Sequence, residues 1–163
     1  MAITFRSYGT GAGSGGSASI TKPSGLALND LMLANVITHN GSISSDGTWT
    51  QIYNDVNTYY FALFYKVAVQ ADVDATNFAF TGGTSLIRGI VSAYIGVDTT
   101  SPISDKNHNT GSGTSLTTTG FVQSNASEMI ILFASLYKLN GASTYNPYTL
   151  TNSDPGLVQD TYF

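Results

Sequence analysis

Apolar and polar side chains alternate along much of this chain, and the alternation restricts it to extended strands. Residues 58–69 are the clearest case, because large apolar side chains occupy every second position. These side chains are Tyr59, Phe61, Leu63, Tyr65, Val67 and Val69. Residues 87–97 repeat the pattern. Successive side chains of a strand point to opposite faces, so a period of two predicts two long strands, each with one apolar face.

Further stretches are also predicted as strands. Five are short, and they comprise residues 3–8, 18–22, 48–53, 76–81 and 157–162. Two others, 31–38 and 129–137, are apolar on both faces. Such runs are typical of central strands, or of strands whose second face is covered by another sheet or subunit. A helix over 129–137 is the less favoured alternative, since periodicity does not separate a buried helix from a buried strand.

Turn residues separate the predicted strands. Asn40-Gly41, Asp46-Gly47, Gly82-Gly83 and Asn140-Gly141 are dipeptides that accept positive φ, and Gly82-Gly83 is expected at a hairpin tip. All four prolines fall outside the predicted strand interiors. No capped amphipathic helix is indicated. We therefore expect an all-β fold, an antiparallel β-sandwich of jelly-roll-like form, in a single domain that spans residues 1–163.

Two stretches are low in complexity. Residues 9–16 (GTGAGSGG) are glycine-rich and are expected to form a flexible loop. Residues 107–119 are polar and are expected to form a long surface connection. Neither has the position of a domain boundary, because too little of the chain precedes the first.

Charged residues are scarce, and this excludes several classes of protein. They make up 10% of the chain, against about 25% in a typical soluble domain. Six Lys and Arg and a net charge of -4 do not provide the clustered cations that nucleic-acid binding requires. No apolar run is long enough to span a membrane. We therefore expect no nucleic-acid partner and no insertion into a membrane.

The few charges fall mainly in predicted turns and at strand ends. Strand faces rich in Thr, Ser, Ala and Tyr cost less to desolvate than charged faces. This distribution favours a chain that packs against copies of itself.

Few residues belong to types that act in catalysis or bind metals and cofactors. Cysteine is absent, which excludes disulfides, thiolate metal sites and a cysteine nucleophile. Gly11–Gly16 matches the G-x-G-x-x-G pattern, but a strand is predicted after it where dinucleotide binding needs a helix. His39 and His108 could belong to a hydrolase, yet no G-x-S-x-G elbow marks a nucleophile. We therefore expect no catalytic residues and no cofactor.

Asp72 and Asp74 lie close together in a predicted turn. They are weak candidates for calcium binding, without the full EF-hand pattern. The favoured interpretation is a solvated turn that holds no metal.

Three aromatic residues are candidates for glycan or partner contact. Tyr145 and Tyr148 flank Pro147 in a loop-like stretch rich in hydroxyl and amide side chains, a combination suited to sugar rings. Trp49 is the third candidate, but it shares a predicted strand face with Gln51 and Tyr53. A core position is therefore the favoured interpretation for Trp49.

The order of the motifs resembles a β-sandwich module that recurs in bacteriophage tail-fibre, baseplate and head-surface proteins. Residues 20–34 (ITKPSGLALNDLMLA) are similar to its "tKPsG…GDlmla" opening. The motifs that follow are Gly47-Thr48-Trp49, Tyr65-Lys66-Val67-Ala68, Phe78-Ala79-Phe80, Ala93–Asp98 and Pro102-Ile103. The likeness covers residues 20–137. It implies a structural or adhesive role on a virion surface and no catalytic residues.

Two departures from that module have consequences. Asn29 stands where the module usually has glycine, which asparagine tolerates because it accepts positive φ. The chain also ends on the aromatic stretch 160–163, where the module usually continues with another strand. We expect either a fragment of a longer protein or a neighbouring subunit that supplies the missing strand.

Taken together, we expect a non-enzymatic phage structural protein on the virion surface, an extracellular particle. Its place would be a tail fibre, a baseplate or a capsid decoration. Its partners would be other virion proteins, copies of itself (trimers are common in fibres) and host-surface glycans. The alternatives are a carbohydrate-binding module of a secreted or surface protein and, less favoured, a glycan-active hydrolase.

Overall fold

The computed structural model describes residues 2–39, 41–55, 60–83, 86–108 and 128–133, and the backbone of 158–160. Most of the predicted loop 107–119 and the second half of the predicted strand 129–137 lie outside these residues. In the described part of the chain, no helix is long and apolar enough to cross a membrane.

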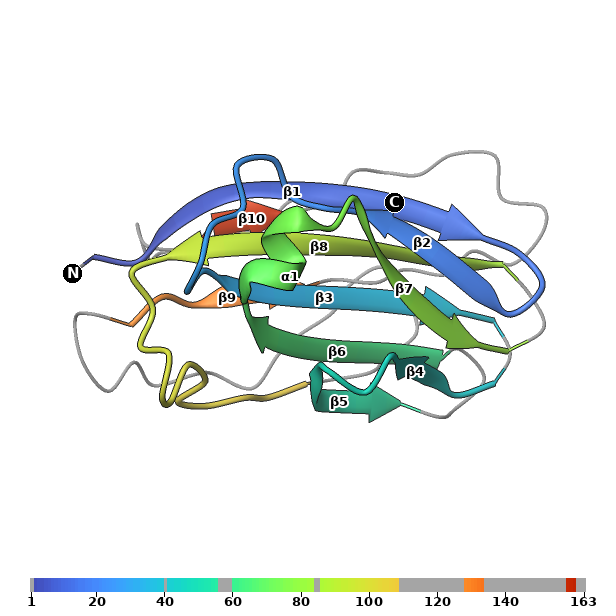
Figure 1. Ribbon diagram of the computed structural model, residues 1–163. Coiled ribbons are helices and arrows are strands. Elements are labelled where there is room, and N and C mark those ends of the chain that lie inside the picture. The colour runs from blue at the N-terminus through green and yellow to red at the C-terminus, as the bar shows by residue number, and fades with distance from the viewer. Residues whose placement is uncertain are drawn as a thin grey trace.

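The chain forms strands with one short helix between them (Figure 1). In chain order these are β1 Thr4–Gly13, β2 Ser17–Thr21, β3 Leu31–Thr38, β4 Ile43–Ser45, β5 Thr50–Asp55, β6 Tyr60–Val67, α1 Gln70–Asp74, β7 Asn77–Gly82, β8 Ile87–Ile95, β9 Ile131–Phe133 and β10 Val158–Asp160. The first eight strands form one antiparallel sheet in the order β4-β7-β2-β1-β8-β3-β6-β5, and β9 pairs with β10 in parallel. The all-β, antiparallel prediction is confirmed.

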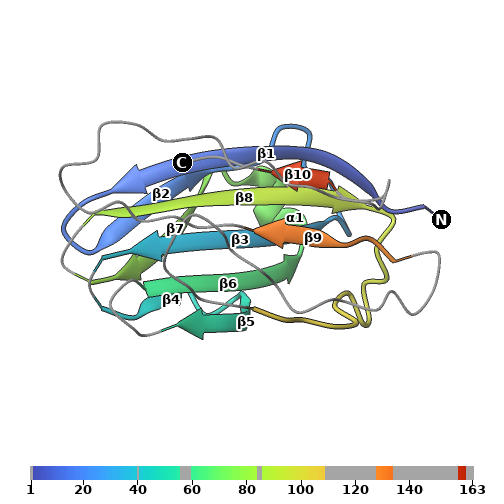
Figure 2. The same ribbon diagram turned by 180° about the vertical axis from the view of Figure 1, so that it is seen from behind.

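The large sheet folds over on itself, so that β2, β7 and β4 lie across β8, β3 and β6 (Figures 1 and 2). Its two edge strands, β4 and β5, lie close together. The Asn54 side-chain amide of β5 donates to the Ile43 carbonyl of β4 at 3.5 Å. The sheet is therefore nearly closed. The jelly-roll form remains a prediction.

Glycines on β1 make this folding possible, and they correct the prediction of a flexible loop over residues 9–16. The strand β1 continues through Gly13, and only residues 14–16 form the turn. A Cβ atom added at Gly11 would lie 2.0 Å from the carbonyl oxygen of Ser19 on β2, and Gly9 and Gly13 are equally crowded at 1.9 Å from β2 carbonyls. Hydrogen in place of a side chain lets β2 cross over β1. The glycine-rich sequence is therefore a close contact between two strands.

The core fills the space inside the folded sheet. Its large members are Ile20, Met32, Val36, Ile43, Trp49, Phe64, Phe78, Phe80, Ile87 and Val91. Alternate residues of β2, β3, β7 and β8 contribute to it, as the period-two pattern predicts. In β6 the prediction is wrong about the face: Ala62 and Phe64 are buried in the core, whereas Phe61, Leu63 and Tyr65 on the predicted apolar face are only half-buried.

A second, smaller cluster covers the outer face of the same sheet. Leu31, Leu33 and Tyr94 are buried there, beneath β9 and the residues that precede it (Figure 2). The apolar side chains of Met129, Ile131 and Phe133 pack against them. This explains why β3 is apolar on both faces: it is a central strand with a layer on each side, as its sequence predicts.

The segment that leads into β3 is a chain of turns held by Asp30. Gly25 and Asn29 both have positive φ, at 68° and 66°. The buried Asp30 carboxylate accepts the Ala27 backbone N–H at 2.8 Å, and its Oδ2 lies 2.6 Å from Nε of Arg6 on β1. Asp30 therefore ties the entry of β3 to β1.

Replacing Asn29 tests the expectation that this position needs a residue tolerant of positive φ. Asn29→Ala is expected to lower the free energy of unfolding by about 1 kcal/mol, because a Cβ-bearing residue without a short polar side chain is strained there. Asn29→Gly is expected to change it by less than about 0.5 kcal/mol. Urea unfolding followed by circular dichroism measures both; equal losses in the two variants would contradict the conformational explanation.

Candidate functional site

Trp49, one of the three predicted glycan contacts, lies in the core. It is 7% exposed, and its ring centroid is 5.4 Å from that of Phe78 and 5.5 Å from that of Phe80. Its face is therefore not open to a sugar. The other two predicted contacts, Tyr145 and Tyr148, lie outside the described residues.

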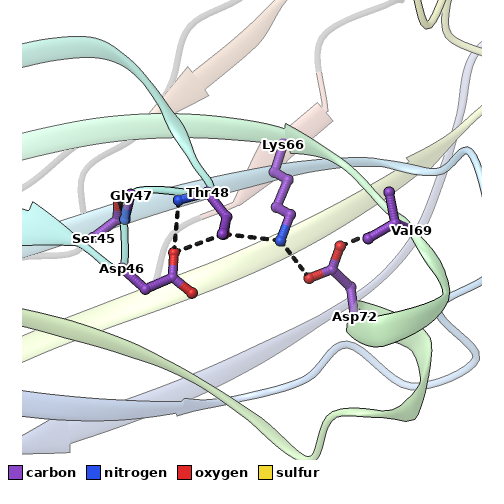
Figure 3. Close-up of polar contacts among 7 residues, drawn as sticks. All are labelled: Ser45, Asp46, Gly47, Thr48, Lys66, Val69 and Asp72. Carbon is purple, nitrogen blue, oxygen red and sulfur yellow. Dashed lines mark hydrogen bonds and ion pairs between the residues drawn. The ribbon is translucent and has the colours of Figure 1, made fainter.

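The two predicted metal candidates belong to α1, where the sequence indicated only a turn. Asp72 is buried, and its carboxylate accepts from Lys66 Nζ at 2.6 Å and from the Val69 backbone N–H at 3.0 Å (Figure 3). Asp74 is exposed and accepts from the Gln70 side-chain amide at 2.8 Å. Both oxygens of Asp72 are thus occupied by nitrogen donors. Within the described residues, no group of three His, Asp or Glu could hold a metal ion.

Lys66 extends this contact into a chain of polar groups (Figure 3). Its Nζ also donates to the Thr48 hydroxyl at 2.9 Å, and this hydroxyl donates to Asp46 at 2.6 Å. Burial raises the pKa of Asp46, but the hydrogen bonds from Thr48 and the charge of Lys66 outweigh it and hold that pKa below 3.8. This series of hydrogen bonds connects the β4–β5 turn to the start of α1, so we assign these polar groups a structural role.

Breaking the Lys66–Asp72 pair is expected to destabilise the fold. Both side chains are largely shielded from water, at 13% and 7% exposure. Asp72→Ala should cost about 2 kcal/mol, between the values for exposed and fully buried pairs, because Lys66 keeps its charge and loses its partner. Asp74→Ala on the same helix is the matched control and should cost about 0.5 kcal/mol or less. Urea unfolding of both variants is the measurement; a loss in Asp74→Ala as large as in Asp72→Ala would contradict the assignment.

A β-bulge on β5 changes which residues share a face. The register with β6 shifts between Gln51 and Tyr53, so Tyr53 lies opposite Leu63 on the outer side of the sheet. Trp49 and Tyr53 therefore do not share a face, and the prediction that they do is wrong. Tyr53 instead packs against Phe61 and makes a hydrogen bond with His108, while burial beside Asp55 raises its pKa.

The candidate functional site is an open cleft of about 360 Å³ beside this irregular edge strand, which we call the β5 cleft. It is lined by Thr50, Gln51 and Ile52 of β5, by Tyr65 of β6, and by residues 103–106 of the segment that follows β8. In Figures 1 and 2 this segment, coloured yellow to ochre, descends from the end of β8 towards β5.

Three interactions hold residues 103–106, which form one wall of the β5 cleft, in place. Ile103 packs into the outer apolar cluster with Ile52 and Tyr65. Lys106 Nζ donates to the Ile52 carbonyl at 3.2 Å, and the Lys106 backbone N–H donates to Asp105 at 2.7 Å. Exposed Ser104 and Asp105 are therefore supported from both ends.

Of the residues singled out for function from the sequence, none that the structure describes lines this cleft, and no local signal marks it. Its walls come from residues about 50 positions apart, and the bulge that shapes β5 has no distinctive dipeptide. His39, the other histidine considered for catalysis, is exposed at the end of β3.

Comparisons of the chain with protein-family models, with curated proteins and with solved structures found no match.

Proposed function

We propose that this chain is a non-enzymatic structural protein of a bacteriophage virion surface, in a tail fibre, a baseplate or a capsid decoration, and that it assembles with copies of itself. Two lines of support lead to this proposal. One is the chemistry of an exposed sheet face, which carries most of the argument. The other is the structural part played by the residues of the resembling motif.

The exposed face of β2, β7 and β4 bears no charge. Its residues are Ser17, Ser19, Thr21, Ser44, Asn77, Ala79 and Thr81, and all are exposed. These small side chains leave the face without long projections. Covering it with a second copy would desolvate hydroxyl and amide groups that can bond across the contact, without the cost of stripping water from charges. This β2–β7–β4 face is the observation that best supports self-assembly.

The motif that resembles the phage module consists of residues that build the fold. Gly25 forms a turn with positive φ, and Asp30 joins β1 to the entry of β3. Asn29, which stands in place of the module's usual glycine, keeps a positive φ. A module whose distinctive residues are all structural fits a scaffold that is reused in different surface proteins. This supports a structural role, and the virion is the setting that the resemblance implies.

Sedimentation velocity over a range of concentrations tests the assembly. We expect species at multiples of 17.2 kDa. Ala79→Lys places a charge in the middle of the β2–β7–β4 face and should shift the distribution towards the monomer. Thr100→Lys, on an exposed loop after β8, is the matched control and should not. A strictly monomeric protein at high concentration would contradict the proposed self-assembly.

A further inference from the structure

The β5 cleft contains hydroxyl groups with unused hydrogen-bonding capacity. Among the described residues, the side chains of Thr50, Tyr65 and Ser104 have no hydrogen-bond partner. Asp105 uses its Oδ1 on a backbone N–H, and its Oδ2 has no partner in the same part of the chain. Each hydroxyl can donate and accept, and the carboxylate accepts only. A ligand for this cleft therefore needs a donor for Asp105, and it can pair with the three hydroxyl groups through donors or acceptors.

The charges of the cleft favour a neutral ligand. Asp105 and Lys106 contribute one charge of each sign, and the ammonium group of Lys106 is already directed to the Ile52 carbonyl. The lining therefore carries no net charge, which gives neither an anion nor a cation an overall electrostatic advantage. In the remaining lining, Gln51 is polar and accepts from the Asn54 side-chain amide at 3.4 Å. Ile52, Ile103 and the half-buried ring of Tyr65 provide an apolar wall.

We propose that the β5 cleft binds a neutral saccharide. Sugar hydroxyls both donate and accept, which matches Thr50, Ser104 and Asp105, and the C–H face of a pyranose suits the apolar wall. The volume of about 360 Å³ is within the range of about 300–1,000 Å³ that small-molecule sites occupy. The inference gives the proposed surface protein a ligand, and it does not depend on the assembly of copies.

An extended peptide added to the edge of β5 is the rival occupant. Strand addition needs the outward backbone groups of the edge strand to be available. Lys106 already occupies the Ile52 carbonyl at the centre of the cleft, and the bulge interrupts the regular spacing of the neighbouring groups. These two features favour a sugar over a peptide strand.

Titration followed by two-dimensional amide NMR tests the proposal. The probes are glucose, galactose, N-acetylglucosamine and their neutral di- and trisaccharides at millimolar concentration. We expect at least one probe to shift the amide signals of residues 50–52 and 103–106 in a saturable manner. No saturable shift with any probe, or shifts confined to other residues, would overturn the proposal. Tight binding of an extended peptide at β5 that excludes sugar would also overturn it.

Matched variants assign the binding to the cleft. Asp105→Ala should weaken the affinity for the responding sugar about tenfold, since a hydrogen bond to a charged group is lost. Asp98→Ala is the control, because Asp98 is also exposed and also accepts one nearby backbone N–H, from Thr100 at 2.8 Å. Equal affinity in the Asp105→Ala variant and the unmodified chain would overturn the assignment. A negative result for sugar binding would leave the sedimentation result unaffected, so the sugar-binding proposal and the self-assembly proposal are tested independently.

Discussion

Gly11→Ala is expected to lower the free energy of unfolding by at least about 3 kcal/mol, at the upper end of the cost of overpacking. The added methyl group would lie 2.0 Å from the carbonyl oxygen of Ser19 and 2.6 Å from the Cα atom of Ile20. Both are backbone atoms, so no side-chain rotation relieves the clash, and β2 must move away from β1. Urea unfolding monitored by circular dichroism measures the loss.

Ala12→Val is the matched control for this experiment. Ala12 is the next residue of β1, and its exposed side chain points to the opposite face. Added bulk there should change the stability by no more than about 0.5 kcal/mol. If Gly11→Ala were as well tolerated as Ala12→Val, the close approach of β1 and β2 would not be what folds the sheet over.

Trp49→Ala is expected to cost about 4 kcal/mol, in the range for removing a large aromatic side chain from a core. Trp49 fills the space between β7 and the β4–β5 turn, where it packs edge-on against Phe78. Its removal leaves a large cavity that surrounding strands, held by backbone hydrogen bonds, cannot close. The same unfolding assay applies.

Leu28→Ala serves as the control for Trp49→Ala, because Leu28 is 54% exposed. It should cost less than about 1 kcal/mol. A small loss for Trp49→Ala would mean that its ring is dispensable to the core, and the prediction of Trp49 as a glycan contact would regain support.

The strand content could be predicted from the sequence because it depends on local alternation. The strand β3 was predicted as residues 31–38 and is found as Leu31–Thr38, and its two apolar faces indicated a layer on each side. Asn29 has positive φ, which fits the glycine usual at this position of the resembling module and which asparagine tolerates. In these cases the property lies in the residues themselves, and the surroundings only reinforce it.

The glycine-rich stretch shows where local reasoning fails. Glycine lowers strand propensity, so residues 9–16 indicated a loop. The requirement for Gly11 comes from β2 crossing above it, a contact between strands that no single stretch reveals. Glycines at every second position, here 9, 11 and 13, are the signal that could have indicated one crowded face of a strand.

The β5 cleft could not be predicted from the sequence, for a related reason. A one-residue bulge in β5 moves Tyr53 to the other face and leaves Ile52 beside residues 103–106. Neither the bulge nor the partner segment is marked in the sequence. Its polar side chains are common residue types, and only their convergence beside an edge strand distinguishes them.

The proposed function combines these features in one surface protein. A nearly closed sheet provides a rigid scaffold, and the uncharged β2–β7–β4 face provides a surface for another copy. The β5 cleft shares no residue with the β2–β7–β4 face, although β5 and β4 lie close together. Assembly and sugar binding could then take place on the same particle without competing for residues.

Immunogold electron microscopy is the most direct test of the virion location. Antibodies raised against the purified chain would be applied to intact particles purified from the stock that encodes it. We expect gold at repeated positions on the surface of the head or the tail. Antigen found only in the particle-free fraction, with unlabelled particles, would contradict the proposal.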